Sequence, residues 1–295
     1  MPDSNTNALV SANWIESHLD EFREPDAEYR LLEVNNPSVT PESDYTPYET
    51  GHIPGATFFD WETDLSDTVS RDILDRESFE RLNWAAGIDD DTTLVIYGGG
   101  RVPNWFALFA FWEYKYFGHD DVRILDGGKP YWVANDYPLT EDLPDFPERE
   151  YSAGGPYESI RAYRDDVEQA IESDVPLVDV RSPDEFTGKV IAPEELQETA
   201  QRGGHIPGAK NVPTTSVLNE DGTFKDPDEL AALYEDVGIT SDQSVITYCR
   251  VGERSSIEWF VLDELLGFED VQNYDGSWTE WGNTIRVPIE TGQSE

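Results

Sequence analysis

Short apolar runs alternate with amphipathic stretches along the chain. The runs at 177–180 and 244–248 are apolar and rich in β-branched residues, which predicts buried strands. Over 227–237 and 255–266 the apolar residues recur at helical spacing, which predicts helices. Buried strands that alternate with amphipathic helices are typical of an α/β fold, with a parallel sheet and helices on both faces.

The same pattern occurs twice. LLEV at 31–34 is echoed by LVDV at 177–180, and GHIPGA occurs at 51–56 and again at 204–209. TLVIYGGG from position 93 matches SVITYCRVG from 244, and DVRILDGGKPYW from 121 matches DVQNYDGSWTEW from 270. The members of each pair lie about 150 residues apart, so we predict two copies of one domain. We expect domains at 8–137 and 159–288, joined by an extended linker at 138–158 that is rich in Pro, Gly and acidic residues.

The charge of the chain is strongly acidic. It has 295 residues, with 62 Asp and Glu against 20 Lys and Arg, for a formal net charge of −42. An aromatic content of 12% indicates a folded protein rather than a disordered one. Nucleic acid and anionic membranes are poor partners for this charge. In roughly molar salt the Debye length falls to about 3 Å, which screens most of the repulsion between these charges. The charge therefore favours a protein from a halophile over one from a mesophile. No long apolar run or signal peptide is present, so we expect a cytoplasmic protein.

The one cysteine of the chain excludes an intrachain disulfide and a cysteine-rich metal site. Cys249 directly follows the strand at 244–248 and precedes the helix at 255–266. In parallel sheets, ligands bind at this carboxyl end of the strands. Amide N–H groups and the helix dipole at such a position lower a cysteine pKa, which predicts a nucleophilic thiolate. Arg250 and Arg254 beside it favour a small anion as ligand. The alternative is a buried structural cysteine flanked by surface arginines.

The chain resembles the two-domain rhodaneses, the thiosulfate sulfurtransferases. The resemblance rests on the two GHIPGA segments, on YCRVGERSS at 248–256 and on NYDGSWTEW at 273–281. The resemblance covers most of the chain. It implies two tandem α/β domains, each with a five-stranded parallel sheet flanked by helices on both faces. It also implies an inactive N-terminal copy, in agreement with Gly98 at the position that matches Cys249.

By this resemblance, Cys249 attacks the outer sulfur of thiosulfate, sulfite leaves, and the resulting persulfide passes its sulfur to cyanide, a small thiol or a protein thiol. We expect no metal and no cofactor. The chemistry requires N–H donors for the transferred sulfur and cations for the sulfonate. The candidate site residues are Cys249 as nucleophile and, for substrate binding, Arg250, Val251, Gly252, Glu253, Arg254 and, after the strand at 177–180, Arg181. Two of these depart from the family: vertebrate rhodaneses carry a lysine at the position of Val251, and Glu253 adds a carboxylate to an anion site.

Three other functions compete with this interpretation. Cysteine phosphatases need five residues between cysteine and arginine, whereas four separate Cys249 from Arg254. The 3-mercaptopyruvate sulfurtransferases typically have CGSG where this chain has CRVG, so Arg250 favours thiosulfate. A module that relays persulfide sulfur to a protein partner remains open, because persulfide formation is common to both functions.

The remaining motifs predict structure rather than chemistry. His52 and His205 each lie in one of the two GHIPGA segments, and the domain that contains His52 lacks the cysteine. We therefore expect both rings to bond to backbone rather than to act in catalysis. Ser277 and Glu280 fit a capping box at the start of a short helix. Trp278 and Trp281 are expected in the core.

Overall fold

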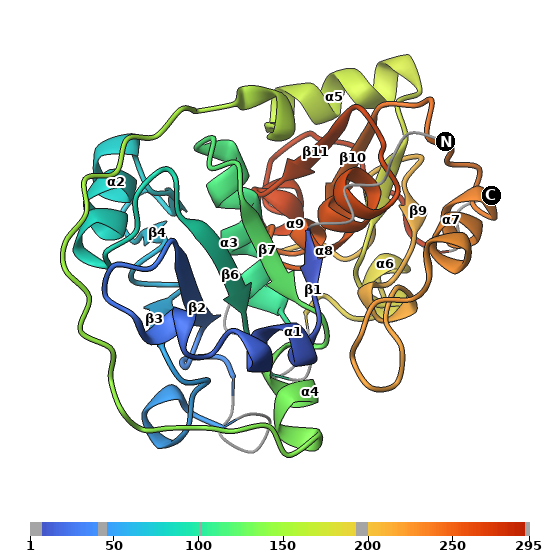
Figure 1. Cartoon of the computed structure of the whole chain (residues 1–295). Coiled ribbons are helices and arrows are strands. Elements are labelled where there is room, and N and C mark those ends of the chain that lie inside the picture. The colour runs from blue at the N-terminus through green and yellow to red at the C-terminus, as the bar shows by residue number, and fades with distance from the viewer. Residues whose placement is uncertain (1–7, 41–45, 101, 193–199, 293–295) are drawn as a thin grey trace. The chain divides into compact units, whose positions relative to one another are not determined.

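The computed structural model describes residues 8–40, 46–100, 102–192 and 200–292 (Figure 1). The chain divides into two compact units. The N-terminal unit comprises Asn7–Tyr157 with Glu220–Thr223, and the C-terminal unit includes Glu158–Asn219 and Phe224–Glu295. None of the helices in the described ranges combines the length and apolar content that crossing a membrane requires.

The N-terminal unit contains a five-stranded sheet in the order β1-β7-β6-β2-β3, and every neighbouring pair is parallel. The strands of this sheet are β1 (Leu9–Val10), β2 (Tyr29–Asn35), β3 (Ala56–Asp60), β6 (Thr93–Tyr97) and β7 (Val122–Leu125). The short strands β4 (Ser66–Asp67) and β5 (Asp72–Ile73) pair separately. The helices are α1 (Ala12–Ser17), α2 (Arg76–Ala85), α3 (Trp105–Tyr116) and α4 (Gly128–Ala134), with 3₁₀ turns η1 (Glu21–Arg23) and η2 (Tyr48–Thr50).

Both faces of this sheet are covered. Leu31 and Val95 pack in one cluster with Ile15 of α1 and Trp132 of α4. The alternate strand residues are equally buried and face the other side, where α3 packs against β2, β6 and β7. Strands buried on both faces explain the continuous apolar runs in the sequence.

The C-terminal unit repeats the arrangement with a parallel sheet in the order β11-β10-β8-β9. Its strands are β8 (Leu177–Asp179), β9 (Lys210–Asn211), β10 (Val245–Tyr248) and β11 (Val271–Tyr274). The expectation of five strands is met in the N-terminal unit. Here the described residues form four strands, and beside β11 the fifth position is reduced to a parallel bridge between Arg161 and Asn273.

The helices of the C-terminal unit lie close to the predicted positions. The predicted helix at 227–237 is α7 (Pro227–Glu235), and the one at 255–266 is α8 (Ser255–Phe260), which continues as the π-helical turn η5 (Val261–Leu265). The other elements are α5 (Arg164–Ser173), α6 (Pro183–Phe186), α9 (Ser277–Trp281) and the 3₁₀ turns η3 (Glu158–Ile160) and η4 (Thr214–Ser216).

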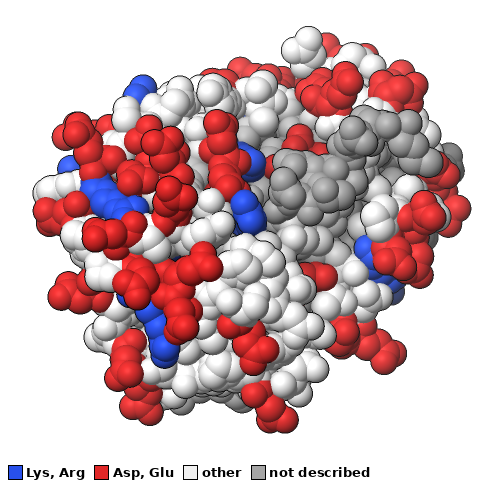
Figure 2. Space-filling view, viewed as in Figure 1, with Lys and Arg blue, Asp and Glu red and all other residues white. Residues whose placement is uncertain are grey.

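The stretch predicted as linker belongs to the N-terminal unit up to Tyr157, and it forms no helix or strand between residues 141 and 157. Tyr151 is buried and its ring stacks on His119. Carboxylates are prominent over the face that Figure 2 shows, with few Lys or Arg between them. This distribution follows from 62 acidic and 20 basic residues, because charged side chains are rarely buried.

Candidate active site

Cys249 stands at the carboxyl end of β10, at the first position of a loop that leads into α8. We call residues 249–254 the cysteine loop. The side chain of Cys249 is fully buried, and the amide of Gly252 donates a hydrogen bond to its Sγ at 3.2 Å. Gly252 has φ +95°, and a Cβ at this position would lie 2.5 Å from the Cα of Asp275, so the loop needs glycine there. The loop therefore places an N–H donor on the sulfur, as the sequence predicts.

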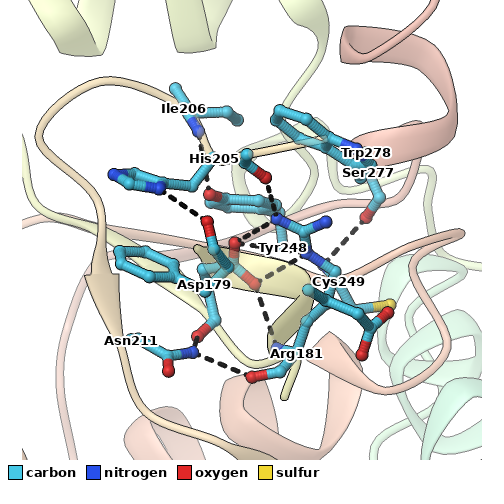
Figure 3. Close-up of polar contacts among 12 residues, drawn as sticks. Asp179, Arg181, His205, Ile206, Asn211, Tyr248, Cys249, Ser277 and Trp278 are labelled. Atoms are coloured by element: carbon cyan, nitrogen blue, oxygen red, sulfur yellow. Dashed lines mark hydrogen bonds and ion pairs between the residues drawn. The ribbon is translucent and has the colours of Figure 1, made fainter. Parts of the chain in front are cut away.

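Two side chains from neighbouring elements hold the cysteine loop. The Oγ of Ser277 accepts the amide N–H of Cys249 at 3.0 Å and donates to the carbonyl of Tyr274 at 2.6 Å (Figure 3). The amide of Asn273 donates to the carbonyl of Gly252 at 3.1 Å, and its Oδ1 accepts the hydroxyl of Ser255 at 2.6 Å. The backbone around Sγ is thus fixed from β11 and α9.

The protonation state of Cys249 differs from the expectation. Burial raises the pKa of Cys249, the carboxylate of Glu253 raises it further, and Arg254 and backbone N–H groups lower it. The Sγ lies 3.5 Å from Oε2 of Glu253 and donates to it. The prediction of a lowered pKa is therefore wrong for this arrangement, because the removal of water from the thiolate outweighs the local donors. The thiol form is therefore favoured over the thiolate in the resting site.

Ser277 has a different function from the predicted one. Its hydroxyl makes the two bonds described above, while Glu280 accepts the phenol of Tyr274 at 2.7 Å, so the predicted capping box is wrong. Ser277 also has φ +50°, a left-handed conformation that costs a non-glycine residue energy. The matching position of the N-terminal copy is Gly128, with φ +58°. Ser277 is thus strained at a position where the N-terminal copy has glycine, and its hydroxyl holds the backbone of Cys249.

The loop arginines are partly or fully buried. Arg250 is 4% exposed. Arg254 forms an ion pair with Glu185 of α6 at 3.3 Å. Although burial raises the pKa of Glu185, the charge of Arg254 and its hydrogen bonds leave that pKa below the ordinary value. Both cations belong to the cysteine loop itself, and the structure gives Arg254 a carboxylate partner that the sequence did not predict.

Arg181, which follows β8, forms a buried ion pair. Its Nη2 contacts Asp179 Oδ2 at 2.6 Å and the carbonyl of Gly204 at 2.7 Å, and its guanidinium lies 4.5 Å from the centre of the Trp278 ring. Burial opposes the charge, but Asp179 raises the pKa of Arg181 above its ordinary value. Nη1 has no hydrogen-bond partner among the described residues. Most of this side chain is therefore committed to the core rather than turned to an anion (Figure 3).

The N-terminal copy places an equivalent ion pair differently. Glu33 occupies the position of Asp179, and Lys129 contacts it at 2.7 Å with both side chains buried. Asn35 stands at the position of Arg181, and Lys129 at that of Trp278. Each copy thus neutralises the strand-end carboxylate with one cation, which comes from a different element in each.

Both repeated histidines are held by backbone, as expected. His52 Nδ1 lies 2.9 Å from the carbonyl of Tyr48, and His205 Nδ1 lies 2.8 Å from the carbonyl of Phe186. Trp278 and Trp281 are fully buried in the core of the C-terminal unit. These predictions are confirmed.

Sequence reasoning did not predict the contacts that Ser277, Asn273 and Glu185 make with the cysteine loop. The repeat carried a signal for Ser277, since a serine replaces a glycine at a left-handed position. Glu185 is 69 residues from Arg254 in sequence, and no local pattern joins them.

Comparisons with known proteins agree on one family. A model of the rhodanese-like domain matches residues 12–135 and 163–284. A Haloferax volcanii protein named "Putative thiosulfate sulfurtransferase" is 56% identical over 98% of each chain. The sulfur carrier protein TtuD of Thermus thermophilus is 48% identical over 98% of this chain and 99% of its own. The anaerobic ergothioneine biosynthesis enzyme of Chlorobium limicola, solved with trimethyl histidine, superposes with a TM-score of 0.82 at 26% identity, covering 98% of this chain and 71% of that enzyme.

Proposed function

The chain belongs to the rhodanese-like domain family, and from this premise we propose that it transfers the sulfane sulfur of thiosulfate through a persulfide on Cys249. The observation that carries the proposal is the contact between the Gly252 amide and Sγ at 3.2 Å. A donor aimed at the sulfur stabilises the negative charge that develops there during attack. Thiosulfate also agrees with the name of the Haloferax volcanii relative.

In this reaction the sulfur of Cys249 attacks the outer sulfur of thiosulfate, and the bond to the sulfonate sulfur breaks with its electron pair on sulfite. The amides of Val251 and Gly252 hold the transferred sulfur. Arg250 and Arg254 attract the sulfonate, and Arg254 keeps its charge through Glu185. We assign Arg181 to the core beside the site through its ion pair with Asp179, and its Nη1 is the nitrogen left for a donor anion among the described residues. Cyanide or a thiol then removes the sulfane sulfur.

Intact mass spectrometry in high salt tests the proposal. Wild-type protein treated with thiosulfate should gain the mass of one sulfur atom and lose it again on addition of cyanide. Because the chain has one cysteine, Cys249→Ser is a complete control and should gain nothing. A wild-type protein that gains no mass would refute the persulfide.

Arg250 favours thiosulfate over 3-mercaptopyruvate as the donor. A guanidinium at this loop position binds a sulfonate by charge-assisted hydrogen bonds worth about 1.5–3 kcal/mol. Arg250→Gly should raise the KM for thiosulfate by about tenfold or more and leave turnover of 3-mercaptopyruvate less affected. A wild-type preference for 3-mercaptopyruvate would overturn this assignment.

A sulfur relay to a protein partner is the second candidate. The similarity to the sulfur carrier protein TtuD supports it. The step to Cys249 is the same, and the acceptor is then a protein thiol rather than cyanide. Incubating the persulfide form with cell extract and identifying proteins that gain sulfur would separate relay from transfer to small molecules.

A further inference from the structure

The site contains an acidic group that the proposed transfer does not use. Oε2 of Glu253 lies 3.5 Å from Sγ of Cys249, and the thiol donates to it. Glu253 is 3% exposed, and Cys249 is fully buried. A carboxylate in this position opposes an incoming dianion, so its presence on an anion-binding loop needs a chemical explanation.

The resting thiol must lose a proton before it attacks. Burial raises the pKa of Cys249, so little thiolate is present at neutral pH. The Gly252 amide stabilises a thiolate once it forms, but an N–H group cannot accept the proton. Formation of the nucleophile therefore requires a base within reach of Sγ.

The other groups around the site are engaged elsewhere. Glu185 pairs with Arg254, and Asp275, whose Cα lies against Gly252, pairs with Arg161 at 2.7 Å. His205 is bonded to the Phe186 carbonyl and lies 3.5 Å from Glu290. Among the charged groups near the pair, Arg254 interacts electrostatically with both Cys249 and Glu253 and is itself paired with Glu185 of α6. The other charged side chains on these elements are Arg250 on the loop, Glu258 on α8 and Asp275 after β11.

We propose that Glu253 is the general base that takes the proton from the Cys249 thiol, an inference that rests on the proposed sulfur transfer. The proton passes from Sγ to Oε2, and the negative charge moves from the carboxylate to the sulfur. The Sγ electron pair forms the new S–S bond, and the S–S bond of thiosulfate breaks with its pair on sulfite. Sulfite takes the proton from Glu253 and leaves as bisulfite, which restores the carboxylate beside a persulfide anion.

Glu253→Gln tests the proposal, because glutamine keeps the shape and cannot accept the proton. The matched control is Glu229→Gln on the exposed surface of α7, which removes the same charge away from the site. Two rates are measured from neutral to strongly alkaline pH: persulfide formation from thiosulfate by intact mass, and alkylation of Cys249 by uncharged iodoacetamide.

At neutral pH Glu253→Gln should slow persulfide formation by about 100-fold, and the deficit should vanish at high pH, where hydroxide ionises the thiol. Alkylation reports how much thiolate is present and should not slow, because removing the Glu253 carboxylate lowers the pKa of Cys249. The recovery at high pH in the same sample excludes misfolding, and Glu229→Gln should match wild type throughout. A variant that forms the persulfide faster than wild type at neutral pH would show that Glu253 only repels the thiolate, and would overturn the proposal. Equal rates of persulfide formation, or a deficit of the same size at every pH, would overturn it as well.

Failure of the proposed function gives a different result. If wild-type protein is alkylated but gains no sulfur from thiosulfate, the sulfur transfer is wrong. If only the base assignment is wrong, wild type gains sulfur from thiosulfate and Glu253→Gln gains it at the same rate, so the two failures are distinguishable.

Discussion

Arg181 allows a sharp test of whether a buried cation serves the core or the substrate. In Arg181→Met the methionine fills similar space and leaves the carboxylate of Asp179 buried without its ion pair. The bonds lost are those from Nε to Oδ1 at 3.0 Å, from Nη2 to Oδ2 at 2.6 Å and from Nη2 to the Gly204 carbonyl at 2.7 Å. Both side chains are completely buried. Removing one partner of such a pair costs about 3–5 kcal/mol of unfolding free energy.

The N-terminal copy supplies the matched control. In Lys129→Met the carboxylate of Glu33 likewise loses its ion-pair partner, from a pair that is equally buried and has an N–O distance of 2.7 Å. In denaturant titrations at high salt, Arg181→Met should lower the transition of the C-terminal unit and Lys129→Met that of the N-terminal unit. Adding Asp179→Asn to Arg181→Met should recover part of the loss, since it removes the uncompensated charge.

Kinetics on the folded protein complete this test. With the guanidinium committed to Asp179, the KM for thiosulfate should change less than about threefold in Arg181→Met, whereas a lost sulfonate contact raises it about tenfold or more. A destabilisation below about 1 kcal/mol together with a large rise in KM would refute the structural role. It would then place Arg181 in the anion site through Nη1.

Three further outcomes are expected. Ser277→Gly removes the hydroxyl that holds the Cys249 amide but relieves the strain of φ +50°, so it should slow persulfide formation with little loss of stability. Ser277→Ala should both slow persulfide formation and lower stability, because alanine keeps the strain. Equal stability of the two variants would contradict the strain. Burial raises the pKa of Glu258 well above its ordinary value of 4.5, so above that pH folding takes up a proton and stability falls as pH rises. Glu258→Gln should therefore be more stable than wild type in thermal melts, by a margin that grows from pH 5 to pH 8. Because the net charge is −42, the Tm should rise steeply between 0.1 M and 2 M KCl, and a Tm independent of salt would remove the argument for a salt-adapted surface.

Much of the fold could be predicted from local patterns. The mainly apolar, β-branched runs at 177–180 and 244–248 predicted buried strands, because a strand covered by helices on both faces of its sheet has few polar residues. The repeat predicted two similar sheets, although the fifth strand of the C-terminal one is reduced to a bridge at Arg161. The position of Cys249 at the end of β10 followed from the same reasoning.

The sequence by itself determined the duplication, the strand that carries the cysteine, the glycine and arginines of the loop, and the excess of negative charge. Tertiary structure alone decided the protonation state of Cys249, the partner of Arg181 and the support from Ser277, 28 residues away in the chain. The physical reason is that strand and helix patterns depend on neighbours along the chain. A pKa or a buried ion pair depends instead on how much water is excluded and on which distant charges fold against the group.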